Sequence, residues 1–314
     1  MTPFVNELEL IDLLTHRLPA NDAVKVGPGD DCAVLNLGVA NRFVLFKTDA
    51  IVEGVHFTRD APPDRIGHKA LARALSDIAA MAGTPSAAVI TLALPKDFEP
   101  KFVQRIYAGM NALARRHHVA IVGGETTANP AGILISVALI GLVAKDKCVL
   151  RRGALAGDAI FVTGELGGSI AGRHLDFEPR LSEARWLAEH FPIHCMIDVS
   201  DGLAGDLRHL LTASQVGAEL LAKAIPLSHA AKLRARSSSL AKPPVLAALS
   251  DGEDFELLFT VASSDAVPLL DAWKKHFPQL KLSCIGKVAA EPGVRLRDEH
   301  GIKTLTAHGY VHFG

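Results

Sequence analysis

The chain has few cysteines, few aromatic residues and no strong net charge, and each shortage excludes a class of protein. Its four cysteines, Cys32, Cys148, Cys195 and Cys284, lie far apart and form no CxxC pair, so neither a disulfide framework nor a zinc ribbon is expected. Lysine and arginine (33) nearly balance aspartate and glutamate (34), which leaves no electrostatic footprint for nucleic acid or an anionic membrane. We therefore expect neither as a partner.

Membrane spans and secretion signals are also absent from the sequence pattern. The longest apolar stretch, Ile133 to Ala144, is too short to cross a bilayer. The first 18 residues contain Glu7, Glu9 and Asp12, and they lack the basic start and unbroken apolar core of a signal peptide. We therefore expect a cytoplasmic protein, whose 49% hydrophobic and 21% charged residues are typical of a compact globular chain.

The length and the periodicity predict two domains of mixed α/β architecture. At 314 residues the chain exceeds the size at which a single hydrophobic core stops growing. Apolar strands alternate with amphipathic helices, which favours α/β. Residues 145–158 combine charges and glycines between two apolar strands, so we place the domain boundary there, with domains over 1–146 and 147–314.

The same periodicity predicts individual elements. Helices are expected over 6–18, 66–82, 99–117 and 203–213, a further helix after a glycine-rich turn at 163–169, strands over 33–35, 43–48, 87–93, 120–122, 133–143, 159–163, 195–199 and 254–262, and an irregular excursion over 224–244.

Acidic residues recur where these apolar strands and helices end, mostly next to glycine, serine or threonine. Such segments are 29–31, 48–49, 76–77, 124–127, 198–202 and 251–254. If these carboxylates converge, each close pair repels by about 4 kcal/mol at 4 Å and an effective dielectric constant near 20, so the cluster must take up protons or metal. Oxygen ligands without a Cys or His cage favour Mg²⁺. Since Mg²⁺ shares its ligands with substrate phosphates, the pattern indicates nucleotide chemistry.

The phosphate-binding segment is less well defined. No GxxxxGK[ST] motif is present, which excludes a P-loop kinase, and the GxGxxG fingerprint is incomplete at Gly27 and Gly29. Glycine-rich turns are predicted at 123–127 and 163–169. Either turn could bind phosphates through its backbone amides, and both alternatives stay open. His56, which follows the Asp49 turn, is a candidate for contacting an anionic substrate.

Read together, seven ordered motifs resemble the thiamine-monophosphate kinase family, within the superfamily typified by aminoimidazole ribonucleotide synthetase. The motifs span nearly the whole chain: GPGDDCAVL (27–35), KTDAIVEGVHF (47–57), ALSDIAAMAGTP (74–85), IVGGETT (121–127), VTGELGGSIAG (162–172), IDVSDGLAGDL (197–207) and DGEDFELLF (251–259). The resemblance implies a homodimer of two-domain subunits, whose N-terminal sheets associate into a barrel-like core. It also implies transfer of the γ-phosphoryl group of ATP to thiamine monophosphate with Mg²⁺ as cofactor.

The resemblance further implies roles for individual residues. The expected metal ligands are Asp30, Asp31, Thr48, Asp49, Asp77, Glu125, Asp198 and Asp201. Gly124, Glu125, Arg151 and Ser200 are expected to contact ATP, and His56 and Glu253 the thiamine monophosphate. Asp49, Asp201 and Arg151 are the expected catalytic residues, acting by positioning and by neutralising phosphate charge.

Five positions depart from the family pattern. Glu125 stands where an Asp is usual, Lys47 replaces a Ser or Thr, His117 replaces a Tyr, Asp251 replaces a Gly, and Ala307 aligns with the aromatic residue that stacks on the substrate. These departures leave two alternatives open. The chain is then a paralogue with the same Mg-ATP site and another acceptor, or a catalytically silent nucleotide-binding regulator.

Overall fold

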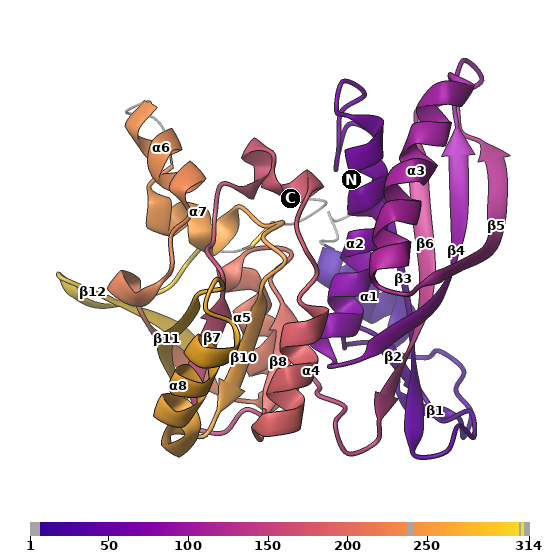
Figure 1. Ribbon diagram of the computed structural model, residues 1–314. Helices are drawn as coiled ribbons and strands as arrows, with labels where there is room; N and C mark the ends of the chain where they lie inside the picture. The colour runs from indigo at the N-terminus through magenta and orange to yellow at the C-terminus, as the bar shows by residue number, and fades with distance from the viewer. Residues whose placement is uncertain (1–6, 238–241, 308, 311–314) are drawn as a thin grey trace.

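The computed structural model describes residues 7–237, 242–307 and 309–310 as two sheets joined through a buried helix (Figure 1). The N-terminal sheet has the order β1-β2-β3-β6-β4-β5, in which β4 and β5 pair in parallel and the other neighbours are antiparallel. Its strands are β1 (Val24–Val26), β2 (Ala33–Leu35), β3 (Arg42–Val52), β4 (Thr84–Leu94), β5 (Ala120–Ala128) and β6 (Leu134–Ala144).

The C-terminal sheet has the order β13-β12-β9-β11-β7-β10-β8. Only the β9–β12 pairing is parallel among its described neighbours. Its strands are β7 (Ala159–Thr163), β8 (Cys195–Asp198), β9 (Gly217–Leu221), β10 (Leu257–Val261), β11 (Leu282–Ala289), β12 (Gly293–Asp298) and β13 (Gly301–Thr304). The two sheets fall on either side of residues 145–158, while the division into domains at 146/147 stays a prediction.

Eight α-helices accompany the sheets in the described part of the chain. They are α1 (Glu7–Thr15), α2 (Pro63–Ala80), α3 (Pro100–Arg116), α4 (Leu181–His190), α5 (Leu203–Ser214), α6 (His229–Ser237), α7 (Pro244–Ser250) and α8 (Ala266–His276). None of the described helices is both long and apolar enough to cross a membrane.

Helix α2 is the element that joins the two halves, because it contacts β3 and β6 on one side and α4 and β8 on the other. Most of its 18 residues are buried. Its packing against α3 depends on two glycines, since a Cβ at Gly67 would lie 1.8 Å from the Ile106 carbonyl oxygen and one at Gly109 would lie 1.8 Å from that of Asp64. Polar side chains on α2 are therefore held rigidly between the domains.

Several sequence predictions need correction. The strand predicted at 120–122 continues to Ala128, so 123–127 is strand rather than turn. The glycine-rich turn at 163–169 leads only into three-residue 3₁₀ helices, and α4 begins at Leu181. The described part of the 224–244 excursion contains α6.

Candidate active site

Three buried aspartates from three distant segments meet at the junction of the two halves. Asp31 precedes β2, Asp77 lies on α2 and Asp198 ends β8, and a carboxylate oxygen from each lies within 4.8 Å of the others. Their exposed fractions are 1%, 7% and 3%. Asp31 Oδ2 is buried without a hydrogen-bond partner among the described residues. An unsatisfied acceptor in a buried cluster of carboxylates fits a divalent cation such as Mg²⁺.

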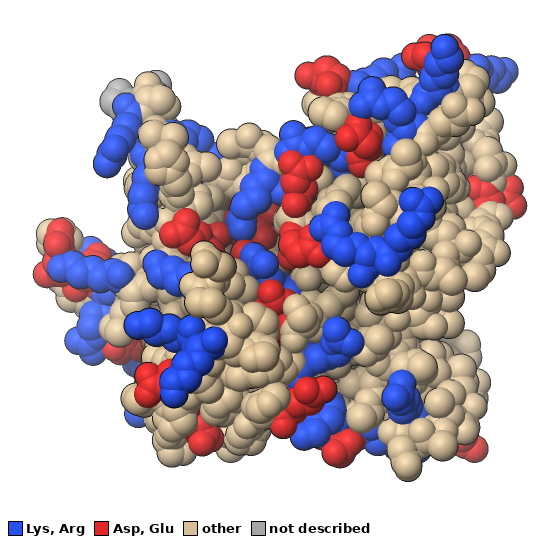
Figure 2. All heavy atoms as spheres, in the orientation of Figure 1, with Lys and Arg blue, Asp and Glu red and all other residues tan. Residues whose placement is uncertain are grey.

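Two basic side chains neutralise part of this cluster. The Arg151 guanidinium donates to Asp31 Oδ1 over 2.6 Å and 3.2 Å, and Lys47 Nζ lies 3.1 Å from Asp77 Oδ2. Ser76 Oγ donates to Asp198 Oδ2 at 2.5 Å. Lys47, which departs from the family pattern, thus supplies a permanent counterion to one of the candidate metal ligands. Basic and acidic side chains are mixed along the junction between the two halves (Figure 2).

The remaining charge of the cluster is costly in the metal-free protein. Burial, followed by repulsion from Asp31, raises the pKa of Asp198 to about 7. Burial raises the pKa of Asp77 well above its usual value, against the attraction of Lys47. Both carboxyls therefore take up a proton more readily than an ordinary aspartate when no cation is bound.

The other predicted metal ligands lie around the cluster rather than in it. Asp49 on β3 pairs with Arg73, whose Nε lies 2.9 Å from Oδ2. Asp30 accepts hydrogen bonds from the Arg151 and Asp31 backbone amides, so it shapes its loop. Asp201 follows β8, and its backbone amide donates a hydrogen bond to Asp206 Oδ2 on α5. The sequence pattern offered no reason to single out Asp206, a buried carboxylate.

Thr48 and Glu125 lie on the opposite face of the N-terminal sheet from α2. Thr48 Oγ1 lies 3.3 Å from Ser136 Oγ, and Glu125 is in register with Thr91, which is in register with Ser136. Asp49, one residue along β3, faces α2 instead. The structure therefore does not bring Thr48 and Glu125 to the three aspartates.

Neither glycine-rich segment forms the phosphate-binding turn that the sequence predicts. A Cβ at Gly124 would lie 1.8 Å from the Ile90 carbonyl oxygen, so glycine is needed there for the close approach of β5 to β4. The amides of Gly167 and Gly168 donate to Asp254 and Asp251. These two amides, which were candidates for binding phosphate, are therefore already hydrogen-bonded to carboxylates.

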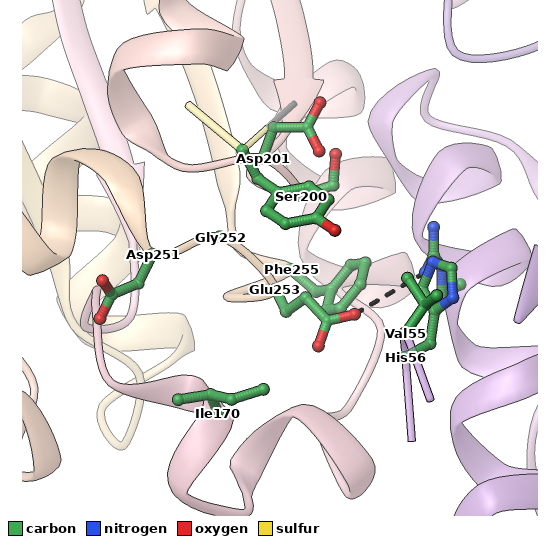
Figure 3. A pocket seen from close by; sticks show the side chains of 11 residues that line it. Val55, His56, Ile170, Ser200, Asp201, Asp251, Gly252, Glu253 and Phe255 are labelled. Atoms are coloured by element: carbon green, nitrogen blue, oxygen red, sulfur yellow. Dashed lines mark ion pairs between the residues drawn. The ribbon is translucent and has the colours of Figure 1, made fainter. Parts of the chain in front are cut away.

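A pocket of about 100 Å³ opens next to Asp201, and its lining includes His56, Arg73, Ser200 and Glu253 (Figure 3). Both predicted acceptor contacts, His56 and Glu253, therefore lie in one pocket with the predicted nucleotide contact Ser200. Asp251 also lines it but points away from Glu253 in Figure 3, because it pairs with Arg234 and Lys242.

Glu253 is fixed by a residue that the sequence analysis missed. Lys69 on α2, fully buried, donates from Nζ to Glu253 Oε2 at 2.7 Å and to the His56 carbonyl oxygen at 2.6 Å. Burial lowers the pKa of Lys69 to about 8, although Glu253 opposes the shift. Glu253 and Phe255 both have positive φ, at 55° and 50°, and such strained backbone is concentrated at functional sites.

Position 307, where the family has an aromatic residue, is an alanine in this chain, but another aromatic residue lies in the pocket. Ala307 packs against the C-terminal core, whereas Tyr310 lines the pocket and is 50% exposed. The Tyr310 amide donates to the Asp201 carbonyl oxygen at 2.8 Å. The pocket therefore does contain an exposed aromatic ring, three residues beyond the position that the sequence comparison indicated.

Family models match both halves of the chain. Residues 29–143 match the N-terminal domain of AIR synthase related proteins, and residues 156–299 match the C-terminal domain. The chain therefore belongs to the AIR synthase related family. Hydrogenase maturation proteins called HypE, 18–21% identical, share this fold.

Relatives that match nearly the full length of the chain show which group within this family it belongs to. The chain is 39% identical over 95% of its length to a thiamine-monophosphate kinase of Rhodopirellula baltica, covering 93% of it. It is also 33% identical to the thiamine-monophosphate kinase of Bacillus subtilis. That match covers 98% of this chain and the whole of the Bacillus protein. A structure described as AaThiL complexed with AMPPCP and TMP superposes with a TM-score of 0.83 at 31% identity, covering 98% of this chain and 97% of that one. Within its family, the chain is one of the thiamine-monophosphate kinases.

Proposed function

We infer that this chain is a kinase that uses ATP to phosphorylate thiamine monophosphate, giving thiamine diphosphate and ADP. The observation that carries this function is the meeting of Asp31, Asp77 and Asp198 beside a pocket that contains His56 and Glu253. The relatives named thiamine-monophosphate kinase and the related structure with AMPPCP and TMP support the same reaction.

We propose that Asp31, Asp77 and Asp198 hold Mg²⁺, which when bound neutralises phosphate charge. Asp49 and Asp201 adjoin this cluster and complete the set of carboxylates. Arg151, fixed to Asp31, presents a positive charge to the nucleotide phosphates, and Ser200 lies where nucleotide and acceptor meet. The acceptor phosphate is already ionised at neutral pH, so the chain needs to position two polyanions and needs no general base.

Lys69 and Glu253 act on the acceptor side of the pocket. The Lys69 ammonium holds the Glu253 carboxylate at the pocket wall. Glu253 is then a fixed acceptor for the polar groups of thiamine, while His56 on the other wall faces the same ligand. The roles of Thr48, Gly124 and Glu125 in binding metal and nucleotide stay predictions, and the cytoplasmic location does as well.

Turnover is the direct test of this function. Purified protein with Mg-ATP and thiamine monophosphate is expected to form thiamine diphosphate and ADP in equal amounts, measured by chromatography. ADP formed only with another phosphorylated or amine acceptor would replace this function with that of a paralogue. Saturable ATP binding without ADP from any acceptor would favour a regulator.

Tyr310→Ala is expected to raise the KM for thiamine monophosphate about tenfold, because an aromatic ring over an aromatic or cationic ligand contributes roughly 1–2 kcal/mol. The KM for ATP should stay within twofold. Tyr310→Phe keeps the ring and is the matched control, with a KM close to that of the wild type. An unchanged acceptor KM in the alanine variant would remove Tyr310 from the acceptor site.

We also propose that the chain forms a homodimer through the sheet face opposite α2, with the two sheets packing into a barrel-like core. Phe46, Val89 and Ile140 are 47%, 42% and 40% exposed, and strand pairing puts them on this one face. Edge strand β5 is almost wholly exposed. An apolar face beside an open edge is typical of an interface.

Ile140→Glu is expected to halve the mass measured by light scattering, because it places a charge in the centre of that face. Val267→Glu is the matched control, since Val267 is an exposed apolar residue on α8, and it should leave the mass unchanged. A wild type that is monomeric at micromolar concentration would contradict the dimer.

A further inference from the structure

Arg73 lines the acceptor pocket and also pairs with Asp49, which lies outside the three-aspartate cluster. Its Nε and Nη2 donate to Asp49 over 2.9 Å and 3.3 Å, and its Nη1 lies 3.7 Å from Glu253, the pair marked by the dashed line in Figure 3. Its guanidinium carbon lies 6.0 Å from the centre of the Phe255 ring. One side chain thus contacts a candidate metal ligand and a candidate acceptor ligand at once.

Arg73 also carries the permanent positive charge of the pocket. Among the described residues that line it, Arg73 is the one Lys or Arg, while Asp201, Asp251 and Glu253 are acidic. Lys69 lies behind the wall with a fully buried side chain, whereas the Arg73 side chain is 15% exposed. A phosphate entering this pocket would therefore meet repulsion unless Arg73 turns toward it.

Both Asp49 oxygens are engaged in the structure. Oδ2 accepts from Arg73 Nε, and Oδ1 accepts from Arg73 Nη2 and the Ala50 amide. A divalent cation that binds Asp49 must compete with the guanidinium for these oxygens. Once displaced, the planar guanidinium fork matches two phosphate oxygens, as it matched the two carboxylate oxygens.

We propose that Arg73 is a substrate-binding residue that takes the acceptor's phosphate, and that Asp49 holds its guanidinium until a divalent cation replaces it. This inference rests on the proposed function for the identity of the acceptor. It makes metal and acceptor binding cooperative, because the cation that takes Asp49 frees the group that binds the acceptor. Arg73 then stabilises the metal-free protein and recognises substrate in the loaded one.

Arg73→Leu separates this role from a structural one. Without the competing guanidinium, the variant is expected to bind Mn²⁺ alone about tenfold more tightly than the wild type, measured by calorimetry without nucleotide. Its KM for thiamine monophosphate should rise about tenfold or more, with the KM for ATP within threefold. Arg73→Lys keeps the positive charge but not the planar guanidinium. Its Mn²⁺ affinity and its KM for thiamine monophosphate should therefore lie between those of Arg73→Leu and the wild type.

Arg65→Leu is the matched control, because Arg65 also lies on α2 and pairs with a carboxylate, Asp176, outside the pocket. It should leave Mn²⁺ affinity and both KM values unchanged. The inference is overturned if Arg73→Leu binds Mn²⁺ no more tightly than the wild type, or if its acceptor KM stays within twofold. A wild type that makes no thiamine diphosphate refutes the proposed function instead, and the Mn²⁺ comparison still decides whether Arg73 competes with metal.

Discussion

Asp198→Asn is expected to lower kcat about 10²–10³-fold while making the metal-free protein more stable at pH 7. The substitution keeps the shape of the side chain but removes a ligand charge, and losing one preorganised charge contact at a reacting centre costs roughly 3–4 kcal/mol of transition-state stabilisation. Without metal, the same charge is a liability, because Asp198 is buried 4.8 Å or less from Asp31 and Asp77. Steady-state kinetics and urea unfolding in EDTA measure the two effects.

The gain in stability should depend on pH in one direction. The pKa of Asp198 is about 7 in the folded chain, against an ordinary value of 3.8, so between pH 4 and 7 the folded state binds more protons at this group than the unfolded state. This group therefore lowers the wild type's unfolding free energy as pH rises, by at most about 1.4 kcal/mol per pH unit. The advantage of Asp198→Asn should grow over the same interval.

Asp64→Asn is the control for this comparison, because Asp64 is a half-exposed carboxylate of α2 paired with Arg105. Its stability relative to the wild type should hardly change between pH 4 and 7. An advantage of Asp198→Asn that is constant across this interval would show that Asp198 is not protonated in the metal-free protein.

Glu253→Gln is expected to cost about 3 kcal/mol of stability at pH 7 and to raise the acceptor KM about tenfold. Lys69 is fully buried, and Glu253 is its ion-pair partner. Removing one partner of a buried pair leaves the other charge uncompensated, which typically costs 3–5 kcal/mol. The acceptor loses an anionic ligand at the same time. Urea unfolding and steady-state kinetics measure the two losses.

Adding Lys69→Met to Glu253→Gln should restore most of the stability but none of the acceptor affinity, because the buried ammonium is gone while the pocket still lacks its carboxylate. In the single variant, the pKa of Lys69 should fall below its present value of about 8. The unfolded chain then binds the extra proton up to pH 10, so the single variant should gain stability as pH rises from 8 to 10. Equal stability of the single and double variants would contradict the coupling of Lys69 and Glu253.

The sequence alone predicted the mixed α/β class, most of the N-terminal elements and the strands β7, β8 and β10. It missed α8, β9 and β11 to β13, where short segments of mixed polarity give no clear period. It also mistook the glycines of 123–124 for a turn. Gly124 is a glycine because β5 approaches β4 closely at this point. A single sequence does not distinguish a glycine required by close packing from one required by a turn with positive φ.

The sequence predicted the three clustered aspartates and Arg151, but it missed two other basic side chains of the candidate site. Asp31, Asp77 and Asp198 do meet, as expected from their places at the ends of apolar elements. Lys69 and Arg73 were not identified, although residues 69, 73 and 77 fall at steps of four and so share one face of the helix. The rest of the stretch from 69 to 80 is apolar apart from Ser76. That spacing was the available signal. The position of Tyr310 in the pocket depends on the tertiary course of the C-terminal segment, which no local pattern contains.

A divalent cation bound by three aspartates that are distant in the sequence is the central feature of the proposed site. Crystals grown with Mn²⁺ and a non-hydrolysable ATP analogue test this directly by anomalous scattering. We expect a peak within about 2.5 Å of carboxylate oxygens from Asp31, Asp77 and Asp198, with the analogue's phosphates beside it. Bound analogue with no anomalous peak at these three side chains would contradict the proposed site.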